Sequence, residues 1–275
     1  MKKRSLFERI AAAPYVAWSA MFIIGPLLFV LFFALTDAKG NFTFDNLLAL
    51  PSYSHTFGIS LGFSLIATTV CLLIGYPLAY CMSRMSERAR SILTILMMLP
   101  MWISLLIRTY SLMALLDNGG LVNSLLVAMG LPRITFIGTE GAVILGMIYD
   151  FLPYMVLPIY TSMTKLDKRY LEAAADLGCN SLQTLFKVVL PLTLPGVISG
   201  VTMVFVPSIS TFFISQSLSD GKIKLIGDVI EQHFNLATTA SYNIGSALSM
   251  VLMILILISM FVMNKLGGDD GGAIV

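Results

Sequence analysis

The sequence predicts an all-α membrane protein whose chain crosses the bilayer six times. The chain is 57% hydrophobic and only 12% charged, whereas a soluble domain carries about a quarter of its residues as charged ones. Its mean hydropathy is +0.87. Six apolar segments each reach the roughly 20 residues that a helix needs to cross the hydrocarbon. Helices are expected because every backbone N–H and C=O must find its partner within its own segment.

The predicted spans follow one another along one membrane domain. In order, they cover about 14–36, 57–81, 91–116, 141–163, 189–215 and 241–264. The first run is too long for a signal peptide, and no small-residue cleavage site follows it. We therefore expect a single domain over 1–275, with a core at about 57–264, and external loops near 37–56, 117–140 and 216–240.

Lysine and arginine predict the orientation. Twelve of them fall on the side that carries both termini, including Lys2, Lys3, Arg4 and Arg9, and four fall on the opposite side. Cytoplasmic loops carry the excess of positive charge in membrane proteins. Both termini are therefore expected in the cytoplasm, and so is the longest loop on that side, at about 164–188.

Several function classes find no support in these residues. A net charge of +2 is too small to indicate a nucleic-acid partner, and the three cysteines have no metal-binding or disulfide spacing. His55 and His233 are isolated, so no metal site is expected. No Ser-His-Asp, Cys-His or paired-carboxylate arrangement that could support catalysis is recognisable. No G-x-x-x-x-G-K-[ST] phosphate loop is present either. The chain is thus expected to be neither an enzyme nor an ATPase.

The stretch EAAADLGCNSLQTLFKVVLPLTLPG, residues 172–196, is a polar insertion in an apolar chain. Residues 166–175 favour a helix, and Gly178 suits its end because glycine tolerates positive φ. Asn180 or Ser181 then suits the cap of a second short helix. Prolines at 191 and 195 follow at the membrane entry, where a missing N–H costs little.

The residue order in this stretch resembles the EAA loop of ABC importer permeases, EAA-x3-G-x9-I-x-LP. Glu172, Ala173, Ala174 and Gly178 match that pattern, Val188 stands in place of isoleucine, and the closing residues are Leu190 and Pro191. The resemblance implies the type I ABC importer permease fold with a cytoplasmic coupling helix. It also implies that Glu172 meets a basic residue of a separate ATPase, that the alanines allow close approach, and that Gly178 makes the bend.

Further segments resemble the permeases of bacterial spermidine/putrescine importers. They are 104–126, with Arg-Thr-Tyr before Gly-Leu-Val-Asn, then 146–167 and 223–234. The chain departs from many relatives at 207–222, which lacks their Gly-Asp-Phe-Val-Thr-Pro-like run. The resemblance implies polyamine cargo, a second permease, two ATPase subunits that bind ATP and magnesium, and a periplasmic binding protein. This chain itself would bind no cofactor.

Two charges fall inside predicted spans, Arg108 and Asp150. A charge at the bilayer centre costs at least ~2.5 kcal/mol, so each needs a partner or a wet cavity. The two lie at similar depths, about 12 Å and 13–14 Å from the outer ends of neighbouring antiparallel spans. One interpretation is an internal ion pair, which can also act as a gate that the cargo opens.

The other interpretation places Asp150 in the cargo pathway, where its carboxylate receives an ammonium group. Aromatic faces also attract cations, and several aromatic residues surround these charges in the sequence. The candidate pathway aromatics are Tyr149, Phe151, Tyr154, Trp102 and Tyr110. Packing or interfacial anchoring is the commoner role of such residues.

Two questions stay open at this point. Five acidic residues on the predicted external side read as solvated surface or as contacts for a soluble partner; they are Asp117, Glu140, Asp220, Asp228 and Glu231. The alternatives to a polyamine importer are an ABC permease for sulfate, ferric ion or another small solute, and a secondary transporter. The last would have no reason to carry an EAA loop.

Overall fold

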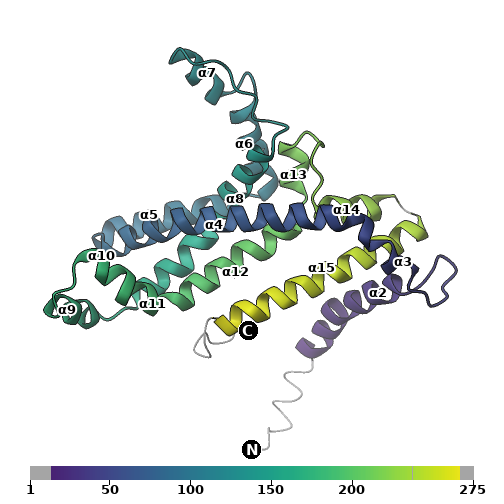
Figure 1. The fold of residues 1–275 in the computed structure, drawn as a ribbon, viewed down its shortest axis with the longest axis horizontal. Helices are drawn as coiled ribbons and strands as arrows, with labels where there is room; N and C mark the ends of the chain where they lie inside the picture. Colours follow the sequence, from purple (N-terminus) through teal and green to yellow (C-terminus); the bar gives the residue numbers. More distant parts are fainter. Residues whose placement is uncertain (1–13, 237, 267–275) are drawn as a thin grey trace, which may run out of the picture. The chain divides into compact units, whose positions relative to one another are not determined.

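The computed structural model describes residues 14–236 and 238–266, and these are predominantly helical (Figure 1). The basic N-terminal cluster of Lys2, Lys3, Arg4 and Arg9 and the tail GGDDGGAIV lie outside the described residues. Contacts divide the chain into two compact units. The first comprises Met1–His55 and Val229–Leu255, and the second comprises Thr56–Asp228 and Ile256–Val275.

In the first unit, amide side chains stabilise the turn that follows the first span. That span runs over Pro14–Ala34 and ends with α2, Gly25–Ala34. Asn46 Nδ2, in α3 (Asp45–Leu48), donates to the carbonyl oxygens of Ala34 and Thr36 at 3.1 and 2.8 Å. Asn243 Nδ2, in α15 (Thr239–Leu266), donates to the same Thr36 oxygen at 2.7 Å. Carbonyls left over at the end of α2 are thus satisfied by side chains.

Hydroxyl groups flank a histidine elsewhere in this unit. His233 lies in α14, Ile226–Asn235, and its Nε2 is 3.0 Å from the hydroxyl of Tyr53, in the short 3₁₀ helix Leu50–Tyr53. Its Nδ1 is 2.9 Å from Ser241 Oγ. Burial lowers the pKa of His233 from its ordinary value. The histidine therefore serves here as a neutral hydrogen-bonding link between α14 and its neighbours.

In the second unit, at least five helices pack on α8, Glu140–Thr164, and three of them are 16 residues or longer (Figure 1). These three are α4 (Ser54–Arg84), α5 (Glu87–Trp102) and α12 (Leu194–Ser210). The most extensive contact is between α8 and α12, and it is close: a Cβ at Gly196 would lie 2.5 Å from Ser162 Cβ and one at Gly200 3.0 Å from the Met155 carbonyl oxygen. Small residues permit such approach between membrane helices.

The third predicted span, 91–116, is not one helix. It breaks into α5 and α6 (Leu105–Leu116), since Ile103 and Ser104 are extended with ψ of 137° and 138°. Pro100 removes one helical hydrogen bond just before the break, which weakens the last turn of α5. A further short helix, α7 (Leu121–Ala128), follows after Gly120. By length and hydropathy, the candidate span in this region is Leu105–Ala128 and not 91–116.

The fifth predicted span, 189–215, is bent and broken. Ser181–Leu192 and Leu194–Ser210 together are apolar enough to cross a membrane, but they meet at an angle of 69°. The chain then turns extended at Thr211 and forms α13, Phe213–Leu218. With this bent pair as one span, the described residues contain up to six membrane-crossing segments.

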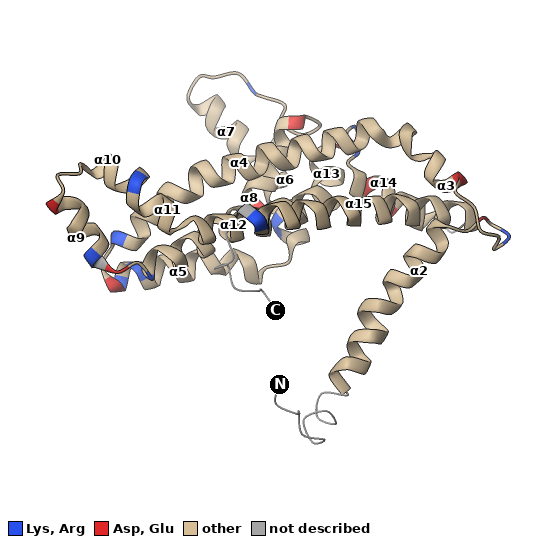
Figure 2. Cartoon of the chain, turned by 60° about the horizontal axis from the view of Figure 1, so that its bottom comes forward, with Lys and Arg blue, Asp and Glu red and all other residues tan. Residues whose placement is uncertain are grey.

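Charge is distributed as a membrane-spanning bundle requires. Figure 2 shows basic and acidic residues gathered around α9, α10 and the ends of the long helices. The helix α12 carries no charged residue, and α15 carries only Lys265, in its last turn. Together with the apolar spans, this pattern makes the chain a multi-pass membrane protein.

Candidate functional site

The polar stretch between α8 and α12 folds as two short helices with defined ends. Asp167 caps α9 (Lys168–Asp176), because its Oδ1 accepts the N–H of Arg169 at 3.0 Å. At the other end Gly178 has φ +78° and donates to the Ala175 oxygen at 2.9 Å, and Cys179 donates to the Ala174 oxygen at 3.0 Å. This paired arrangement is the Schellman motif, and it confirms Gly178 as the helix stop.

The second helix begins with a reciprocal cap. Asn180 Oδ1 accepts the N–H of Gln183 at 2.8 Å, and Gln183 Oε1 accepts the N–H of Asn180 at 2.9 Å. This capping box starts α10, Ser181–Thr184, which continues as a π-helical turn over Leu185–Val189. Of the two cap candidates in the sequence, the structure selects Asn180. We call residues 167–192 the coupling segment.

The coupling segment exposes charged side chains of both signs together with apolar ones. Glu172 and Ala173 are exposed, whereas Ala174 is buried where α9 packs against α10 and the π-helical turn. Large hydrophobic side chains on the segment are more than half exposed, and Leu177 reaches 84%. They are Tyr170, Leu177, Leu182 and Phe186. Exposed apolar groups in a polar setting indicate a surface for a protein partner.

Leu190 and Pro191 lie at the base of the segment, in the three-residue helix Leu190–Leu192 (α11). Pro191 is exposed and Leu190 half-buried. Just before them Val189 is buried in the core, next to the apolar face of the bundle. The predicted coupling residues are therefore divided between an exposed helix tip, at Glu172 and Gly178, and a base anchored in the bundle.

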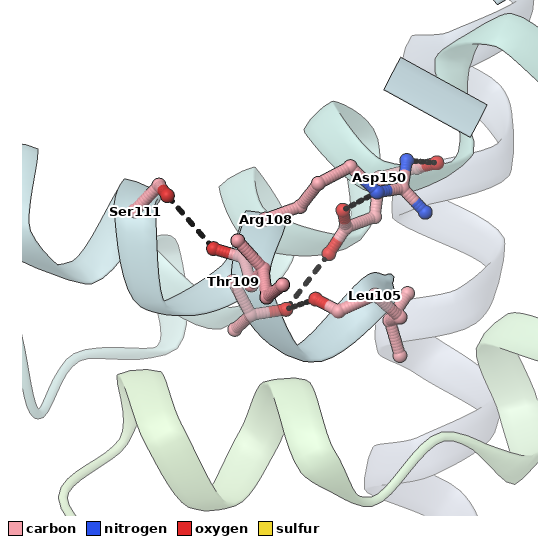
Figure 3. Close-up of polar contacts among 6 residues, drawn as sticks. Leu105, Arg108, Thr109, Ser111 and Asp150 are labelled. Atoms are coloured by element: carbon pink, nitrogen blue, oxygen red, sulfur yellow. Dashed lines mark hydrogen bonds and ion pairs between the residues drawn. The ribbon is translucent and has the colours of Figure 1, made fainter. Parts of the chain in front are cut away.

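The two charges inside the bundle form an ion pair (Figure 3). Arg108 Nε on α6 lies 3.4 Å from Asp150 Oδ1 on α8. A second nitrogen of the guanidinium, Nη1, donates to the Asp150 backbone oxygen at 3.1 Å. The other carboxylate oxygen, Oδ2, accepts a hydrogen bond from Thr109 Oγ1 at 3.0 Å. Asp150 is 0% exposed and Arg108 is 5% exposed, so the pair lies inside the chain.

This geometry gives each charge an ion-pair partner, and the carboxylate is fully enclosed, with Asp150 0% exposed. Removing one member of a buried pair costs about 3–5 kcal/mol, because the other charge stays buried alone. For cargo to reach Asp150, Arg108 and Thr109 would have to release it. As it stands, the arrangement joins α6 to α8 and corresponds to the closed state of any gate built from this pair.

The predicted pathway aromatics differ widely in burial, whereas Asp150 is fully buried. Phe151 is buried and packs edge-on against Tyr154, with ring centroids 6.4 Å apart. Trp102, Tyr110 and Tyr149 are 74%, 52% and 45% exposed. Of the five, Phe151 is buried, Tyr154 is half-buried and the other three are exposed.

One acidic residue was misread from the sequence. Asp228 was grouped with solvated surface residues, but it is only 5% exposed. Its Oδ2 accepts hydrogen bonds from Ser215 Oγ at 2.6 Å and from the Leu225 N–H at 2.7 Å. Its position, two residues inside the start of α14, was the available signal, because acidic side chains there cap the preceding N–H.

The sequence interpretation also missed three hydrogen-bonding residues. Thr109 follows Arg108 directly, yet nothing in the sequence indicated that it would share Asp150. Thr193 and Tyr76 form a contact between segments far apart in the chain, with their hydroxyl oxygens 3.2 Å apart. Within the described ranges, no group of three or more His, Cys, Asp or Glu side chains is arranged to hold a metal ion.

Comparison with known sequences gives a consistent family match. Residues 67–266 match the family described as "Binding-protein-dependent transport system inner membrane component". The spermidine/putrescine transport system permease protein PotB of Haemophilus influenzae is 40% identical over 93% of this chain and 92% of its own length. PotB of Escherichia coli (strain K12) is 38% identical over 87% of this chain and 90% of its length.

A solved structure shares the fold. A chain in the crystal structure of a bacterial alginate ABC transporter, in complex with an alginate pentasaccharide-bound periplasmic protein, superposes with a TM-score of 0.78. The match covers 99% of this chain and 97% of that chain at 18% sequence identity. Likeness at this identity speaks only to the fold, and it confirms the expected fold of type I ABC importer permeases.

Proposed function

This chain belongs to the family of binding-protein-dependent transport system inner membrane components, and on that premise we propose that it is the permease subunit of a polyamine importer. It carries spermidine and putrescine from the periplasm to the cytoplasm and hydrolyses no ATP itself. The observation that carries the proposal is the coupling segment. Its residues follow the EAA pattern, and they lie on an exposed pair of short helices with defined caps. The permeases named for spermidine and putrescine match nearly the whole chain at 37–40% identity, which supports the cargo.

The partners follow from the same premise. A second permease completes the pathway, two ATPase subunits bind ATP and magnesium, and a periplasmic binding protein delivers the cargo. The ATPases dock on the exposed face of the coupling segment, where Glu172 meets a basic residue. Leu177, Leu182 and Phe186 supply the apolar part of that contact, because burying each on docking releases water from a large side chain.

The orientation places the coupling segment and both termini in the cytoplasm. Its support is the bias of lysine and arginine toward that side, which is the usual rule for inner-membrane proteins. The external ends of α8 and α15 then face the periplasm, where the binding protein docks.

Within the membrane, Arg108 and Asp150 act as an internal pair that gates the pathway. A polyamine carries several ammonium groups, so it competes with Arg108 for the Asp150 carboxylate. The exposed rings of Trp102, Tyr110 and Tyr149 meet the ammonium groups of the cargo, while Phe151 and Tyr154 pack against each other on α8. Asp150→Asn tests this role: normal insertion with lost polyamine uptake supports the gate, whereas an unstable subunit shows a merely structural ion pair.

The first experiment measures uptake of labelled spermidine and putrescine in cells that lack this gene and any second polyamine system. We expect ATP-dependent uptake to be lost and a plasmid copy to restore it. Unchanged uptake would overturn the assigned cargo and direct the search to sulfate and metal ions.

The second experiment tests the coupling segment. We expect Glu172→Arg to leave membrane insertion intact and to lower uptake at least ~10-fold, because a repelled ion pair at a docking surface costs more than ~1.4 kcal/mol. Glu87→Arg is the matched control, as Glu87 is also an exposed glutamate, in the first turn of α5. Normal uptake in Glu172→Arg, or an equal loss in Glu87→Arg, would remove the coupling role.

A further inference from the structure

The bend at the base of the coupling segment is centred on Thr193. The two halves of the fifth span meet there at 69°, and Thr193 itself has φ −99° and ψ 3°. Pro191 and Pro195 flank it. Since Pro195 has no N–H, the carbonyl of Pro191 loses the helical donor it would otherwise have. The fifth span therefore lacks one helical backbone hydrogen bond at the point where the coupling segment joins α12, although Thr193 N–H still donates to the Val189 oxygen at 2.9 Å.

The hydroxyl group of Thr193 forms hydrogen bonds across this bend. The residue is 0% exposed, and its Oγ1 donates to the Val189 carbonyl oxygen at 2.8 Å. The Tyr76 hydroxyl of α4 lies 3.2 Å from the same Oγ1. Because a threonine hydroxyl has one hydrogen and Val189 receives it, Tyr76 is the donor in the second bond. A single oxygen thus links the coupling segment, the bend and α4.

Both sides of the bend are packed tightly. On the side of the coupling segment, Val189 is buried in the core and ends a π-helical turn, a local geometry that recurs at functional sites. On the side of α12, a Cβ at Gly196 would lie 2.5 Å from Ser162 Cβ and 2.8 Å from the Pro158 oxygen, so α12 has no free space against α8. Any rotation between the two packed elements is concentrated at Thr193.

We propose that Tyr76 and Thr193 are a positioning pair that makes the bend rigid, so that movement of the coupling segment is passed on to α12. The inference rests on the proposed function. With the pair intact, closure of the ATPases displaces α12 and moves cargo. Without the Tyr76 hydrogen bond, the bend flexes instead, and ATP is hydrolysed with less cargo moved.

The test uses the complete importer in proteoliposomes and measures spermidine uptake and ATP hydrolysis together. We expect Tyr76→Phe to lower the cargo moved per ATP about fivefold, the effect of losing one buried hydrogen bond in a membrane protein, while hydrolysis stays within about twofold. Thr193→Val should behave in the same way, Thr193→Ser should be normal, and the double variant Tyr76→Phe with Thr193→Val should be no worse than either single one.

Two results would overturn the proposal. An unchanged ratio of cargo to ATP in Tyr76→Phe would show that the hydrogen bond transmits nothing. An equal fall of uptake, hydrolysis and subunit amount, with no rescue by Thr193→Ser, would show a merely structural contact.

A second readout needs no cargo and so separates this inference from the proposed function. Two pairs of spin labels are compared, and both use Ile95→Cys on α5 as the reference site. The first pair adds a label at Cys179 of the coupling segment, and the second adds one at Met203→Cys of α12. Cys81→Ser is present in both, and the second pair also carries Cys179→Ser. We expect ATP with vanadate to change both distances in the parent. In Tyr76→Phe the Cys179 distance should still change, and the α12 change should shrink. Equal behaviour of both pairs in the variant would refute the positioning role, whatever the cargo proves to be.

Discussion

The coupling segment and the Arg108–Asp150 contact both place polar groups in an apolar chain, but they are built in opposite ways. The coupling segment keeps Glu172 exposed and satisfies its backbone through caps within a few residues, at Asp167, Gly178 and Asn180. The ion pair is enclosed, and its partners lie 42 residues apart in the chain.

The difference shows which interactions stabilise each region: local ones in the coupling segment and contacts between helices in the ion pair. In the coupling segment, a side chain can change without disturbing the fold, because the helix ends are fixed by local backbone geometry. In the ion pair, every charged atom depends on a partner from another helix. Substitutions should therefore separate function from folding in the first region and combine the two in the second.

The largest expected effect is on the ion pair. Arg108→Leu leaves the Asp150 carboxylate buried with only Thr109 as its side-chain partner and should lower the free energy of unfolding by about 3–5 kcal/mol. The exposed counterpart Asp176→Asn on α9 should change it by less than about 0.5 kcal/mol. Unfolding in mixed SDS micelles measures both.

A double variant sharpens this test. Arg108→Leu with Asp150→Leu removes both charges and should recover most of the lost stability, since apolar replacement of a buried pair is often neutral. A double variant as unstable as the single one would show that the contact does more than pair two charges.

An intermediate effect is expected at the helix stop of the coupling segment. Gly178 has φ +78°, so Gly178→Ala should strain the backbone by about 1–2 kcal/mol and loosen the segment, and uptake should fall with it. Gly130, in the loop after α7, has the same φ, and a Cβ would meet no neighbour at either glycine. Gly130→Ala is thus a control with equal strain, and it should leave uptake unchanged. Amide hydrogen exchange in α9 reports the loosening directly.

The smallest effect is expected at Thr109. Thr109→Val removes one hydrogen bond to Asp150 and should lower the free energy of unfolding by about 0.6–1.7 kcal/mol. Ser111→Ala is the matched control on the same helix and should cost less, because Ser111 is exposed and its Oγ donates to the Ile107 carbonyl oxygen at 2.8 Å (Figure 3). The same unfolding assay measures both variants. A loss at Thr109 as large as that of Arg108→Leu would contradict the ranking of these contacts.

Much of the coupling segment could be predicted because its structure is local. Gly178 as a helix stop and Asn180 as a cap depend on residues within one turn, and both are confirmed. The π-helical turn and the 69° bend at Thr193 could not be predicted in the same way. They depend on how Val189 and Gly196 pack against distant helices, which no short stretch of sequence encodes.

Less of the bundle interior could be predicted from the sequence. Similar depth on neighbouring spans brought Arg108 and Asp150 together as one interpretation, and the structure places them in contact. The break at Ile103 was missed although Pro100 preceded it, because proline within a membrane helix is often tolerated. Asp228 was misread because hydropathy alone does not distinguish a capping carboxylate from a solvated one.

The separation of Arg108 and Asp150 along the chain also bears on how the protein is made. Arg108 leaves the ribosome 42 residues before Asp150, which is about 2–8 s at a synthesis rate of 5–20 residues per second. During that interval α6 carries an unmatched charge and is poorly suited to enter lipid. We therefore expect α6 to enter the lipid more readily once α8 has arrived and Asp150 can pair with Arg108.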